Sequence, residues 1–307
     1  MLGCGNFGGV GSSPAFFGRG ESREDAFAIM DAAWEAGITT FDTADAYGGG
    51  RSEAWIGDWL RTKGAGVRDE LVLSTKTFNP MDEGEDHGLA PQRVRRQLDS
   101  SLERLGVDHV QLYLTHEPDP DVPITETLGV LDELVRAGKV GAFGASNVDG
   151  PQLRDALAAS PGTRYDWVQN SYSLLDRNAE QDVLPLCAEA GLGFTPFSPL
   201  AGGWLTGKYA RGAKAPAGSR MTQRPEPYAH LLDDDAVWRA LDGLAAVASE
   251  RGTSQAALAI AWLLADARVT AAVAGPRRPE HLEPALVALE HPATAAERDE
   301  LARLFAR

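Results

Sequence analysis

Four polar side chains in the first half of the sequence have the types needed to protonate a carbonyl oxygen. They are a carboxylate, a phenol, an amine and an imidazole: Asp42, Tyr47, Lys76 and His116. Asp42 follows the apolar run Ile38–Phe41, and Tyr47 lies in the turn after it. Lys76 and His116 follow the runs Leu71–Thr75 and Val110–Thr115. If these runs are β-strands, the four side chains lie at strand ends and can converge on one site.

The four side-chain types are complementary in the reduction of a carbonyl group. A carbonyl that accepts hydride develops negative charge on oxygen, so an acid must supply a proton. A phenol has an ordinary pKa of about 10, which is too high for efficient donation at neutral pH. A neighbouring ammonium is expected to lower that pKa, and a carboxylate keeps the ammonium charged. A neutral imidazole can hold the substrate oxygen and relay a proton.

Each of the four residues also has an ordinary structural explanation when it is taken alone. An aspartate after a strand often caps a helix, and a lysine is usually a solvated charge. The histidine of His116-Glu117-Pro118 suits a turn, and Tyr47, which precedes three glycines, suits a loop anchor. All four nevertheless fall at the same end of their strands, which is the end that carries the active site in a barrel of parallel strands.

The overall composition restricts the classes of partner. The 307 residues include 29 Lys and Arg against 44 Asp and Glu, a formal charge of −15. This charge repels phosphate backbones and anionic lipid, so neither nucleic acid nor a membrane is an expected partner. Cys4 and Cys187 provide no disulfide framework and no metal-ligand spacing, so no metal is expected. Without a signal-peptide pattern or a long apolar run, a cytoplasmic protein is expected.

Short apolar strands alternate with amphipathic helices along the whole sequence. The predicted strands are Leu2–Gly5, Ile38–Phe41, Leu71–Thr75, Val110–Thr115, Val140–Ala145, Trp167–Asn170, Gly193–Pro196 and Val269–Ala274. Helical spacing of apolar residues predicts helices that include Arg23–Ala36, Ser52–Arg61, Pro91–Leu105 and Ile124–Ala137. The alternation implies parallel pairing, and eight strands favour an α/β fold of the (β/α)8 TIM-barrel type in one domain, residues 1–307.

Two segments depart from this alternation. Lys208–His230 is rich in Gly, Pro and Arg and predicts a long loop after the seventh strand, with extra helices at Asp234–Glu250 and Ser254–Ala265.

Near the start, Gly3-Cys4-Gly5-Asn6-Phe7-Gly8 has the glycine spacing of a dinucleotide fingerprint. Too little chain precedes it to form the required strand, and no helix opens on it, so a barrel strand and its loop are favoured.

Two loops around the last two strands have the composition of an anion site. Ser198–Lys208 is rich in small residues that let backbone N–H groups approach an anion, and Lys208 adds positive charge. Gly275–His281 contains Arg277 and Arg278 before a predicted helix. Each loop alone is equally well explained as flexible or solvated, but barrels often bind phosphate at this place.

The sequence resembles the aldo-keto reductase family over nearly its whole length. The motifs that carry the resemblance are Phe41–Gly48, Gly49–Glu53, Ser74–Lys76, Thr115–Asp119, Gly144–Asn147, Gln169–Leu175 and Ser198–Tyr209. The resemblance implies a barrel that binds NADPH in extended form and reduces an aldehyde or ketone to an alcohol. It makes Tyr47 the general acid, with Asp42 and Lys76 tuning it and His116 positioning the carbonyl.

The resemblance also assigns residues to the cofactor. It places Ser146, Asn147 and Gln169 at the nicotinamide amide, and the pyrophosphate within Ser198, Leu200, Gly202 and Lys208. Arg277 or Arg278 would pair with the 2′-phosphate, in the loop that also contains Gly275 and His281. Tyr172 would pack beside the cofactor. The family usually offers glutamine and asparagine to the adenine, where this sequence has His281 and Ala285, so weaker adenine contacts are expected.

Other features of the sequence leave alternatives open. The family usually has a β-hairpin before its first strand, so we expect either a truncated start or a barrel bottom closed by another segment. Four aromatic residues either line a substrate pocket for a small carbonyl compound or pack ordinarily: Phe7, Phe17, Phe78 and Tyr228. Some members of the family are cofactor-binding regulatory subunits with slow turnover. A Schiff base on Lys76 is a third hypothesis.

Overall fold

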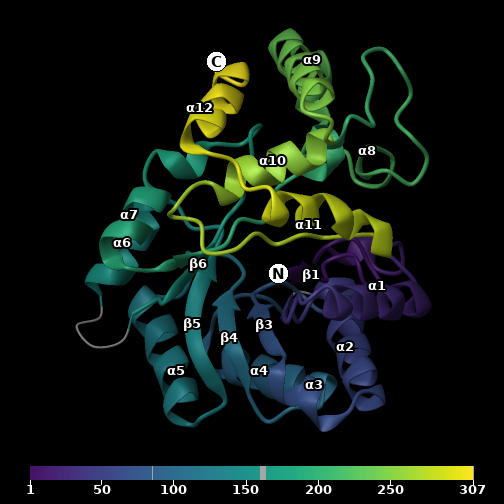
Figure 1. Ribbon diagram of the computed structural model, residues 1–307. Helices are drawn as coiled ribbons and strands as arrows, with labels where there is room; N and C mark the ends of the chain where they lie inside the picture. Colours follow the sequence, from purple (N-terminus) through teal and green to yellow (C-terminus); the bar gives the residue numbers. More distant parts are fainter. Residues whose placement is uncertain (85, 160–163, 307) are drawn as a thin grey trace.

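A curled parallel sheet forms the centre of the molecule (Figure 1). The computed structural model describes residues 1–84, 86–159 and 164–306. Seven strands follow one another in chain order and pair in parallel, β1 with β2 through to β6 with β7. They are β1 (Leu2–Gly3), β2 (Thr40–Asp42), β3 (Val72–Thr77), β4 (Val110–Thr115), β5 (Val140–Ser146), β6 (Trp167–Gln169) and β7 (Gly193–Phe194). This arrangement, with helices around it, fits the predicted α/β barrel.

The predicted eighth strand, Val269–Ala274, is not a regular strand, although its backbone contacts both edges of the sheet. Thr270 N–H donates to the Phe194 carbonyl oxygen at 2.8 Å, and Gly3 N–H donates to the Ala274 carbonyl oxygen at 2.6 Å. The ladder is incomplete because the Phe194 N–H donates to the Thr270 hydroxyl rather than to backbone. Pro196, the next residue that the segment contacts, has no N–H to donate.

Helices follow the strands and cover the sheet. Their bounds are α1 (Arg23–Glu35), α2 (Arg51–Thr62), α3 (Ala65–Glu70), α4 (Pro91–Leu105), α5 (Ile124–Arg136), α6 (Gly150–Ala158), α7 (Val183–Ala190), α8 (Arg220–Gln223), α9 (Asp235–Glu250), α10 (Gln255–Leu264), α11 (Glu283–Glu290) and α12 (Ala295–Leu304). The predicted helices match α1, α2, α4, α5, α9 and α10 to within one residue at each end. No helix in the described ranges is long and apolar enough to span a bilayer.

The segment predicted as a long loop, Lys208–His230, is partly helical. It contains α8, and a short 3-10 helix, Ala229–Asp233, begins near its end. In Figure 1 it lies at the top of the molecule beside α9, on the opposite side from α3 and α5. The C-terminal α12 lies at the same end. The segments that depart from the regular βα alternation therefore gather at one end of the sheet.

The hydrophobic core lies between the sheet and its helices. The rings of Phe41 on β2 and Trp59 on α2 are 5.4 Å apart, and both side chains are fully buried. Phe7, predicted to line a substrate pocket, is also fully buried and belongs to this core. That prediction is wrong because the Phe7 ring has no surface left to contact a ligand. Cys4 and Cys187 are buried free thiols.

The tight pairing of β5 with β6 predicts a strong effect of substituting Gly144. A methyl group at Gly144 would lie 2.0 Å from the Trp167 carbonyl oxygen. We expect Gly144→Ala to lower the free energy of unfolding by about 1–3 kcal/mol, measured by urea unfolding. The control is Gly129→Ala in α5, where the added methyl meets no atom within 4 Å. The control should gain up to about 1 kcal/mol from helix propensity, and equal midpoints for the two variants would contradict the prediction.

Candidate active site

A buried ion pair joins the ends of β2 and β3. The Lys76 ammonium donates to Asp42 Oδ2 at 2.7 Å and to the Thr43 carbonyl oxygen at 2.8 Å. Both side chains are almost fully enclosed. The other carboxylate oxygen of Asp42 accepts hydrogen bonds from Ser74 and Gln169, each at 3.0 Å. Every oxygen of the buried carboxylate therefore has a partner, which is the condition for burying such a charge.

Lys76 stays an ammonium in this setting. Burial disfavours its charge, but the Asp42 carboxylate and the Tyr47 hydroxyl outweigh burial and raise the pKa of Lys76. An amine must lose its proton before it can attack a carbonyl carbon. The pairing with Asp42 therefore argues against a Schiff base on Lys76.

Tyr47 lies over this ion pair because of the turn that follows it. The ammonium of Lys76 is 5.1 Å from the centre of the Tyr47 ring. The next three residues, Gly48–Gly50, have φ angles of 61°, 68° and 87°, which side chains disfavour. A methyl at Gly48 would also come within 2.6 Å of the Phe7 carbonyl oxygen. The glycines of this motif thus let the chain turn sharply and place the phenol between β2 and α2.

The expected lowering of the Tyr47 pKa is wrong for this structure. Part of the side chain reaches solvent, yet the surrounding protein removes water from the hydroxyl, and this desolvation raises the pKa of Tyr47. The Lys76 ammonium acts in the opposite direction, as predicted, but it is the weaker influence, and Asp42 adds to the rise. Tyr47 is therefore held as a neutral phenol that can donate a proton.

His116 faces Tyr47 from the end of β4. Their ring centres are 5.4 Å apart, with the planes at 79°. Burial, together with the Lys76 ammonium, lowers the pKa of His116 to about 3, so the imidazole is neutral. Its Nδ1 atom is buried and has no hydrogen-bond partner among the described residues. The structure thus brings all four predicted side chains together, and one of them keeps an unused polar atom.

The residues predicted to hold the nicotinamide amide come from β5 and β6 beside His116. Asn147 Nδ2 donates to the His116 carbonyl oxygen at 2.9 Å and to Ser146 Oγ at 3.3 Å. Asn147 has a φ of 57°, an unusual value for a residue other than glycine. Gln169 binds Asp42 and so touches the ion pair directly. The backbone N–H of Asn147 donates to the Gln169 carbonyl oxygen at 3.2 Å and joins the two strand ends.

The loop after β7 forms a backbone cradle that excludes side chains. Ser198 and Ala201 have φ angles of 54° and 46°. A methyl at Gly202 would lie 2.4 Å from the Tyr228 ring, and one at Gly203 would lie 2.2 Å from Lys208 Nζ. Tyr228, predicted to line a substrate pocket, packs on this loop, and its hydroxyl donates to Ser198 Oγ at 3.2 Å. Ser198 and Ala201, on either side of Leu200, are thus held in a strained backbone conformation of the kind that clusters at binding sites.

Cations gather beside this loop in an otherwise acidic molecule. Burial and the neighbouring Arg277 and Arg220 lower the pKa of Lys208. Burial, together with Arg224 and Arg277, also lowers the pKa of Arg220. In the described part of the chain neither Lys208 nor Arg220 has a carboxylate within ion-pair distance. Arg220 was not among the predicted site residues because its segment was read as an irregular loop.

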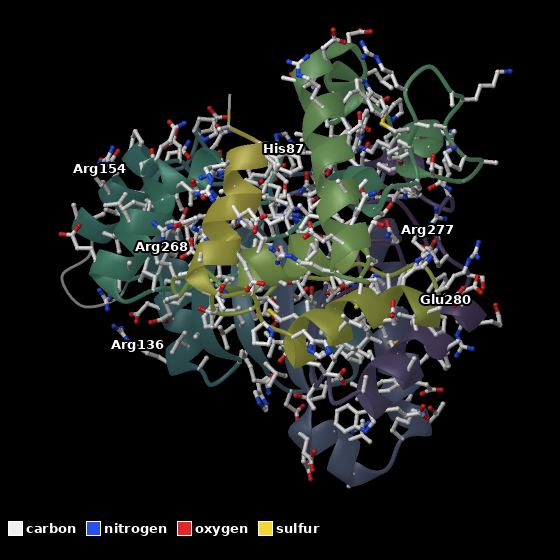
Figure 2. All side chains as sticks on the ribbon, turned by 45° about the horizontal axis from the view of Figure 1, so that its top comes forward. His87, Arg136, Arg154, Arg268, Arg277 and Glu280 are labelled. Atoms are coloured by element: carbon white, nitrogen blue, oxygen red, sulfur yellow. The ribbon has the colours of Figure 1, made fainter. Side chains whose placement is uncertain are left out.

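The two arginines after segment 269–274 have different roles. Arg277 forms an ion pair with the buried Glu21 and donates to the Gly218 carbonyl oxygen, and so clamps the N-terminal loop to the segment before α8. Arg278 is exposed, and its guanidinium is 3.8 Å from the exposed Glu280. Figure 2 shows Arg277 and Glu280 where α11 begins. His281 Nδ1 accepts a hydrogen bond from the Arg277 N–H at 3.3 Å, and Gly275 is exposed beside them.

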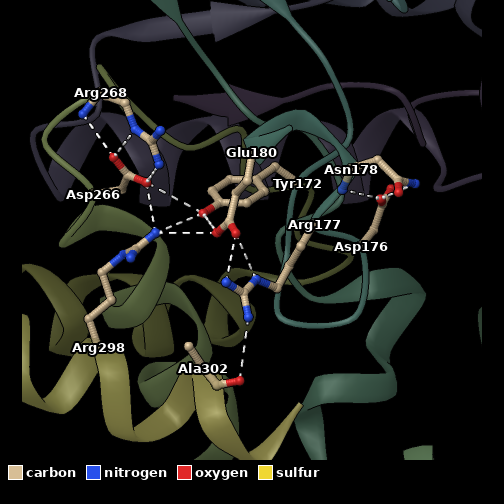
Figure 3. Close-up of polar contacts among 9 residues, drawn as sticks. All are labelled: Tyr172, Asp176, Arg177, Asn178, Glu180, Asp266, Arg268, Arg298 and Ala302. Atoms are coloured by element: carbon tan, nitrogen blue, oxygen red, sulfur yellow. Dashed lines mark hydrogen bonds and ion pairs between the residues drawn. The ribbon is translucent and has the colours of Figure 1, made fainter. Parts of the chain in front are cut away.

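Tyr172 does not have the contacts expected of a residue beside a cofactor. It is fully buried, and its hydroxyl donates to Glu180 at 2.6 Å (Figure 3). Arg298 on α12 donates to the Tyr172 hydroxyl at 2.9 Å and to Asp266 at 2.7 Å (Figure 3). The prediction that Tyr172 packs beside the cofactor therefore does not agree with the structure. Its ring has no exposed face, and its hydroxyl is bound to Arg298 on α12.

Phe197 is a partly buried aromatic residue beside the backbone cradle that was not among the predicted site residues. It follows β7 and precedes Ser198. Its N–H donates to the Asn170 carbonyl oxygen at 3.0 Å, which continues the pairing of β6 with β7. Its position directly after the predicted seventh strand, Gly193–Pro196, is what marks it in the sequence. Of the other predicted aromatics, Phe17 packs on Gly49, and the Phe78 ring lies 6.0 Å from that of His87.

A cavity of about 730 Å³ lies beside the cradle. It is open to solvent on one side and lined by the loop after β6, by residues 227–231, by α9 and by the C-terminal residues 304–306. Ser198 and Tyr228 line it, whereas Asp42, Tyr47, Lys76 and His116 do not. The cavity thus touches the loop after β7 but is separate from the four converging side chains.

Comparison with known proteins places the chain among oxidoreductases. The model of the Aldo/keto reductase family matches residues 2–305, which confirms the resemblance drawn from the motifs. An uncharacterized oxidoreductase of Bacillus subtilis is 37% identical over 286 residues, 89% of this chain and 85% of that protein. The NADH-specific methylglyoxal reductase of Escherichia coli is 31% identical and covers 91% of this chain and 87% of its own length.

Two further relatives extend the comparison. A probable voltage-gated potassium channel subunit beta of rice, Oryza sativa, is 35% identical over 89% of this chain and 84% of its own length. The solved structure of the glycerol dehydrogenase from Gluconobacter oxydans superposes with a TM-score of 0.82 at 26% sequence identity. That superposition covers all of this chain and 90% of the dehydrogenase.

The neutral state of His116 leads to a prediction about pH. An unfolded histidine has a pKa of about 6.5, so at lower pH the unfolded chain binds a proton that the folded chain excludes. The contribution of His116 to stability is therefore complete above about pH 6.5 and is lost as the pH falls toward 3.

The measurement is nitrogen NMR of the His116 ring, assigned by its loss in His116→Gln. We expect no change in its chemical shifts between about pH 8 and pH 5, the range in which ordinary histidines titrate. A titration of this ring with a midpoint near neutrality would contradict the assignment of a neutral, buried imidazole.

Proposed function

Because this chain belongs to the aldo/keto reductase family, we propose that it reduces an aldehyde or ketone to an alcohol with NADPH as the reductant. The observation that carries the proposal is the contact of Tyr47 and His116 above the buried pair of Lys76 and Asp42. When bound, a nicotinamide cofactor supplies the hydride that reaches the carbonyl carbon. Every other step of the proposal belongs to side chains of this protein.

The proposed proton donor is Tyr47. The phenol is neutral in the folded protein, so it carries the proton that the developing alkoxide needs. The Lys76 ammonium beside it stabilises the phenolate that remains after transfer, and Asp42 holds that ammonium in place. The charge of the phenolate is thus met by a cation that is already positioned, which limits reorganisation during the reaction.

His116 is proposed to orient the substrate carbonyl. Its ring is neutral, lies against Tyr47 and has a buried Nδ1 atom without a partner among the described residues. A neutral imidazole can donate one hydrogen bond to the substrate oxygen without competing with Tyr47 for the proton. Two donors aimed at one oxygen would fix the carbonyl for attack.

The chain has residues suited to a nicotinamide dinucleotide. We place the carboxamide near Ser146, Asn147 and Gln169, and Phe197 takes the role expected of Tyr172 as the aromatic residue beside the ring. In this proposal the loop backbone at Ser198–Gly203, with positive φ angles at Ser198, Ala201, Gly202 and Gly203, holds the pyrophosphate. Lys208 and Arg220 have no acidic partner among the described residues and would neutralise its charge.

The preference for NADPH rests on Arg278. The ion pair with Glu21 already occupies Arg277, whereas Arg278 is exposed and only loosely paired. An arginine next to the adenosine ribose accommodates a 2′-phosphate. The NADH-specific relative from Escherichia coli shows that the family does not fix this preference, so it is argued here from Arg278 alone.

A second candidate function comes from the channel subunit relative. At 35% identity, that likeness favours a protein that binds the cofactor and regulates a partner with little turnover. The two functions differ in one measurement. Stoichiometric NADPH binding without reduction across a broad panel of carbonyl compounds would support the regulatory role over the enzymatic one.

Tyr47→Phe tests the proton donor. The substitution keeps the ring and removes the acid, so we expect turnover in NADPH-dependent carbonyl reduction to fall about 100- to 10,000-fold. NADPH binding, followed by quenching of tryptophan fluorescence, should stay near wild type, as should the thermal unfolding midpoint. Near-normal reduction by this variant would refute Tyr47 as the acid.

Arg278→Gln tests the cofactor preference. A charge-assisted hydrogen bond is worth about 1.5–3 kcal/mol, so we expect the Kd for NADPH to rise about 10- to 100-fold while that for NADH barely changes. Arg154→Gln, an exposed arginine on α6, is the control for loss of one positive charge. A wild-type protein that binds NADH more tightly than NADPH would overturn the role of Arg278.

A further inference from the structure

Asp45 is a buried carboxyl group that the proposed reaction does not use. It lies between Asp42 and Tyr47 in the turn after β2 and has no exposed surface. Its Oδ1 atom accepts the Ala46 N–H at 2.7 Å, and its Oδ2 atom accepts the Thr77 hydroxyl at 2.7 Å. Within the described residues no cation lies at ion-pair distance from it. Buried carboxyl groups are costly unless fully paired, so this one requires an explanation.

Thr77 connects Asp45 to a helix on the outside of the sheet. Arg93 of α4 donates to the Thr77 hydroxyl at 3.0 Å, and Thr77 in turn donates to Asp45. Arg93 is itself buried and also binds the Gly88 and Asn79 carbonyl oxygens, at 3.0 and 2.8 Å. The result is a chain of hydrogen bonds from α4 through the end of β3 to the turn that carries Tyr47.

This chain of hydrogen bonds brackets Lys76. Thr77 is the next residue along β3, and the Asp45 N–H donates to the Lys76 carbonyl oxygen at 2.9 Å. The turn is therefore fixed to β3 by one backbone contact at Lys76 and one side-chain contact at Thr77. Tyr47 follows two residues later, so a shift of Asp45 would move the phenol relative to the Lys76 ammonium.

We propose that Asp45 is a positioning residue for the reduction, holding the Tyr47 turn against the Lys76 strand through Thr77 and Arg93. The proposal rests on the proposed function of the site. Displacement of a catalytic group by about 1 Å can cost about 100-fold in rate. Asp45 thus acts on the reaction through Tyr47 and touches neither substrate nor cofactor.

The ionisation of Asp45 makes this positioning sensitive to pH. Burial raises the pKa of Asp45 to about 7, and the buried Glu53 carboxylate on α2 adds to the rise. Thr77, Arg93 and the Ala46 N–H oppose it. Tyr113 on β4 also faces this cluster, and Arg104 pairs with Glu53 at 2.7 Å. Arg93 and Arg104 do not contact Asp45 directly; Arg93 reaches it through Thr77, and Arg104 pairs with Glu53.

The direction of the pH effect follows from the hydrogen bonds. The ionised carboxylate accepts from Ala46 and Thr77 at once, whereas a protonated carboxyl has one oxygen that must donate. Hydrogen bonds to an ionised carboxylate are about twice as strong as those to a neutral carboxyl, so the ionised form of Asp45 holds the turn more tightly. Turnover should therefore rise with pH through an inflection near 7, as the ionised form becomes dominant.

The experiment compares pH profiles of kcat and KM for the wild type, Asp45→Asn, Thr77→Val and Thr77→Ser. We expect Asp45→Asn to lower kcat about 10- to 100-fold and to lose the inflection near 7, with the Kd for NADPH unchanged. Thr77→Val should behave like Asp45→Asn, and Thr77→Ser should behave like the wild type. Because the two residues act through one contact, the double variant Asp45→Asn with Thr77→Val should have a kcat no lower than that of either single variant. Asp242→Asn, at an exposed aspartate of α9, is the charge-matched control and should be unaffected.

Three outcomes would overturn the proposal. Wild-type kcat and pH profile in both Asp45→Asn and Thr77→Val would show that the contact positions nothing. Loss of NADPH binding together with kcat in both variants would show a structural role only. A wild type that reduces no carbonyl compound in the same assay overturns the proposed function and, with it, this role. If the wild type reduces a carbonyl compound normally, a negative result for the variants refutes the role of Asp45 and leaves the proposed function intact. If Asp45→Asn does not fold, the kcat and pH profile of Thr77→Val test the proposal in its place.

Discussion

The buried ion pair of Lys76 and Asp42 is the interaction on which the rest of the site depends. Its charges are fully enclosed, and removing one partner from such a pair usually costs about 3–5 kcal/mol, because the other charge stays buried and uncompensated. The pair needs β2 and β3 in register and uses Ser74 and Gln169 as further donors. It therefore links the order of the strands to the electrostatics around Tyr47 and His116.

Around that pair the molecule separates acid chemistry from anion binding. The side chains that would handle a proton come from β2 to β4, at positions where burial keeps Tyr47 and His116 neutral. The cations that would hold phosphate come from the segment after β7 and from the residues before α11. A formal charge of −15 makes this local gathering of Lys208 and Arg220 all the more distinct. In the proposed function, the nicotinamide end of the cofactor lies beside the first region and its phosphates lie at the second.

Burial decides the behaviour of several titratable groups more strongly than their charged neighbours do. It outweighs the Lys76 ammonium at Tyr47, and it leaves Asp45 with a pKa of about 7 although Arg93 is near. At Lys76 the balance is reversed, because Asp42 is in direct contact. There the Asp42 carboxylate and the Tyr47 hydroxyl together favour the ammonium by more than burial disfavours it.

The sequence by itself determined the order of strands and helices, the family and the four converging side chains, because periodicity and local motifs encode these features directly. Only the tertiary structure decided that Phe7 is core, that Tyr172 binds α12 through Arg298, and that Val269–Ala274 closes the sheet without a regular ladder. It also decided the sign of the Tyr47 pKa shift and revealed Arg220. These outcomes depend on which residues distant in sequence exclude water from a group, and local spacing carries no such information.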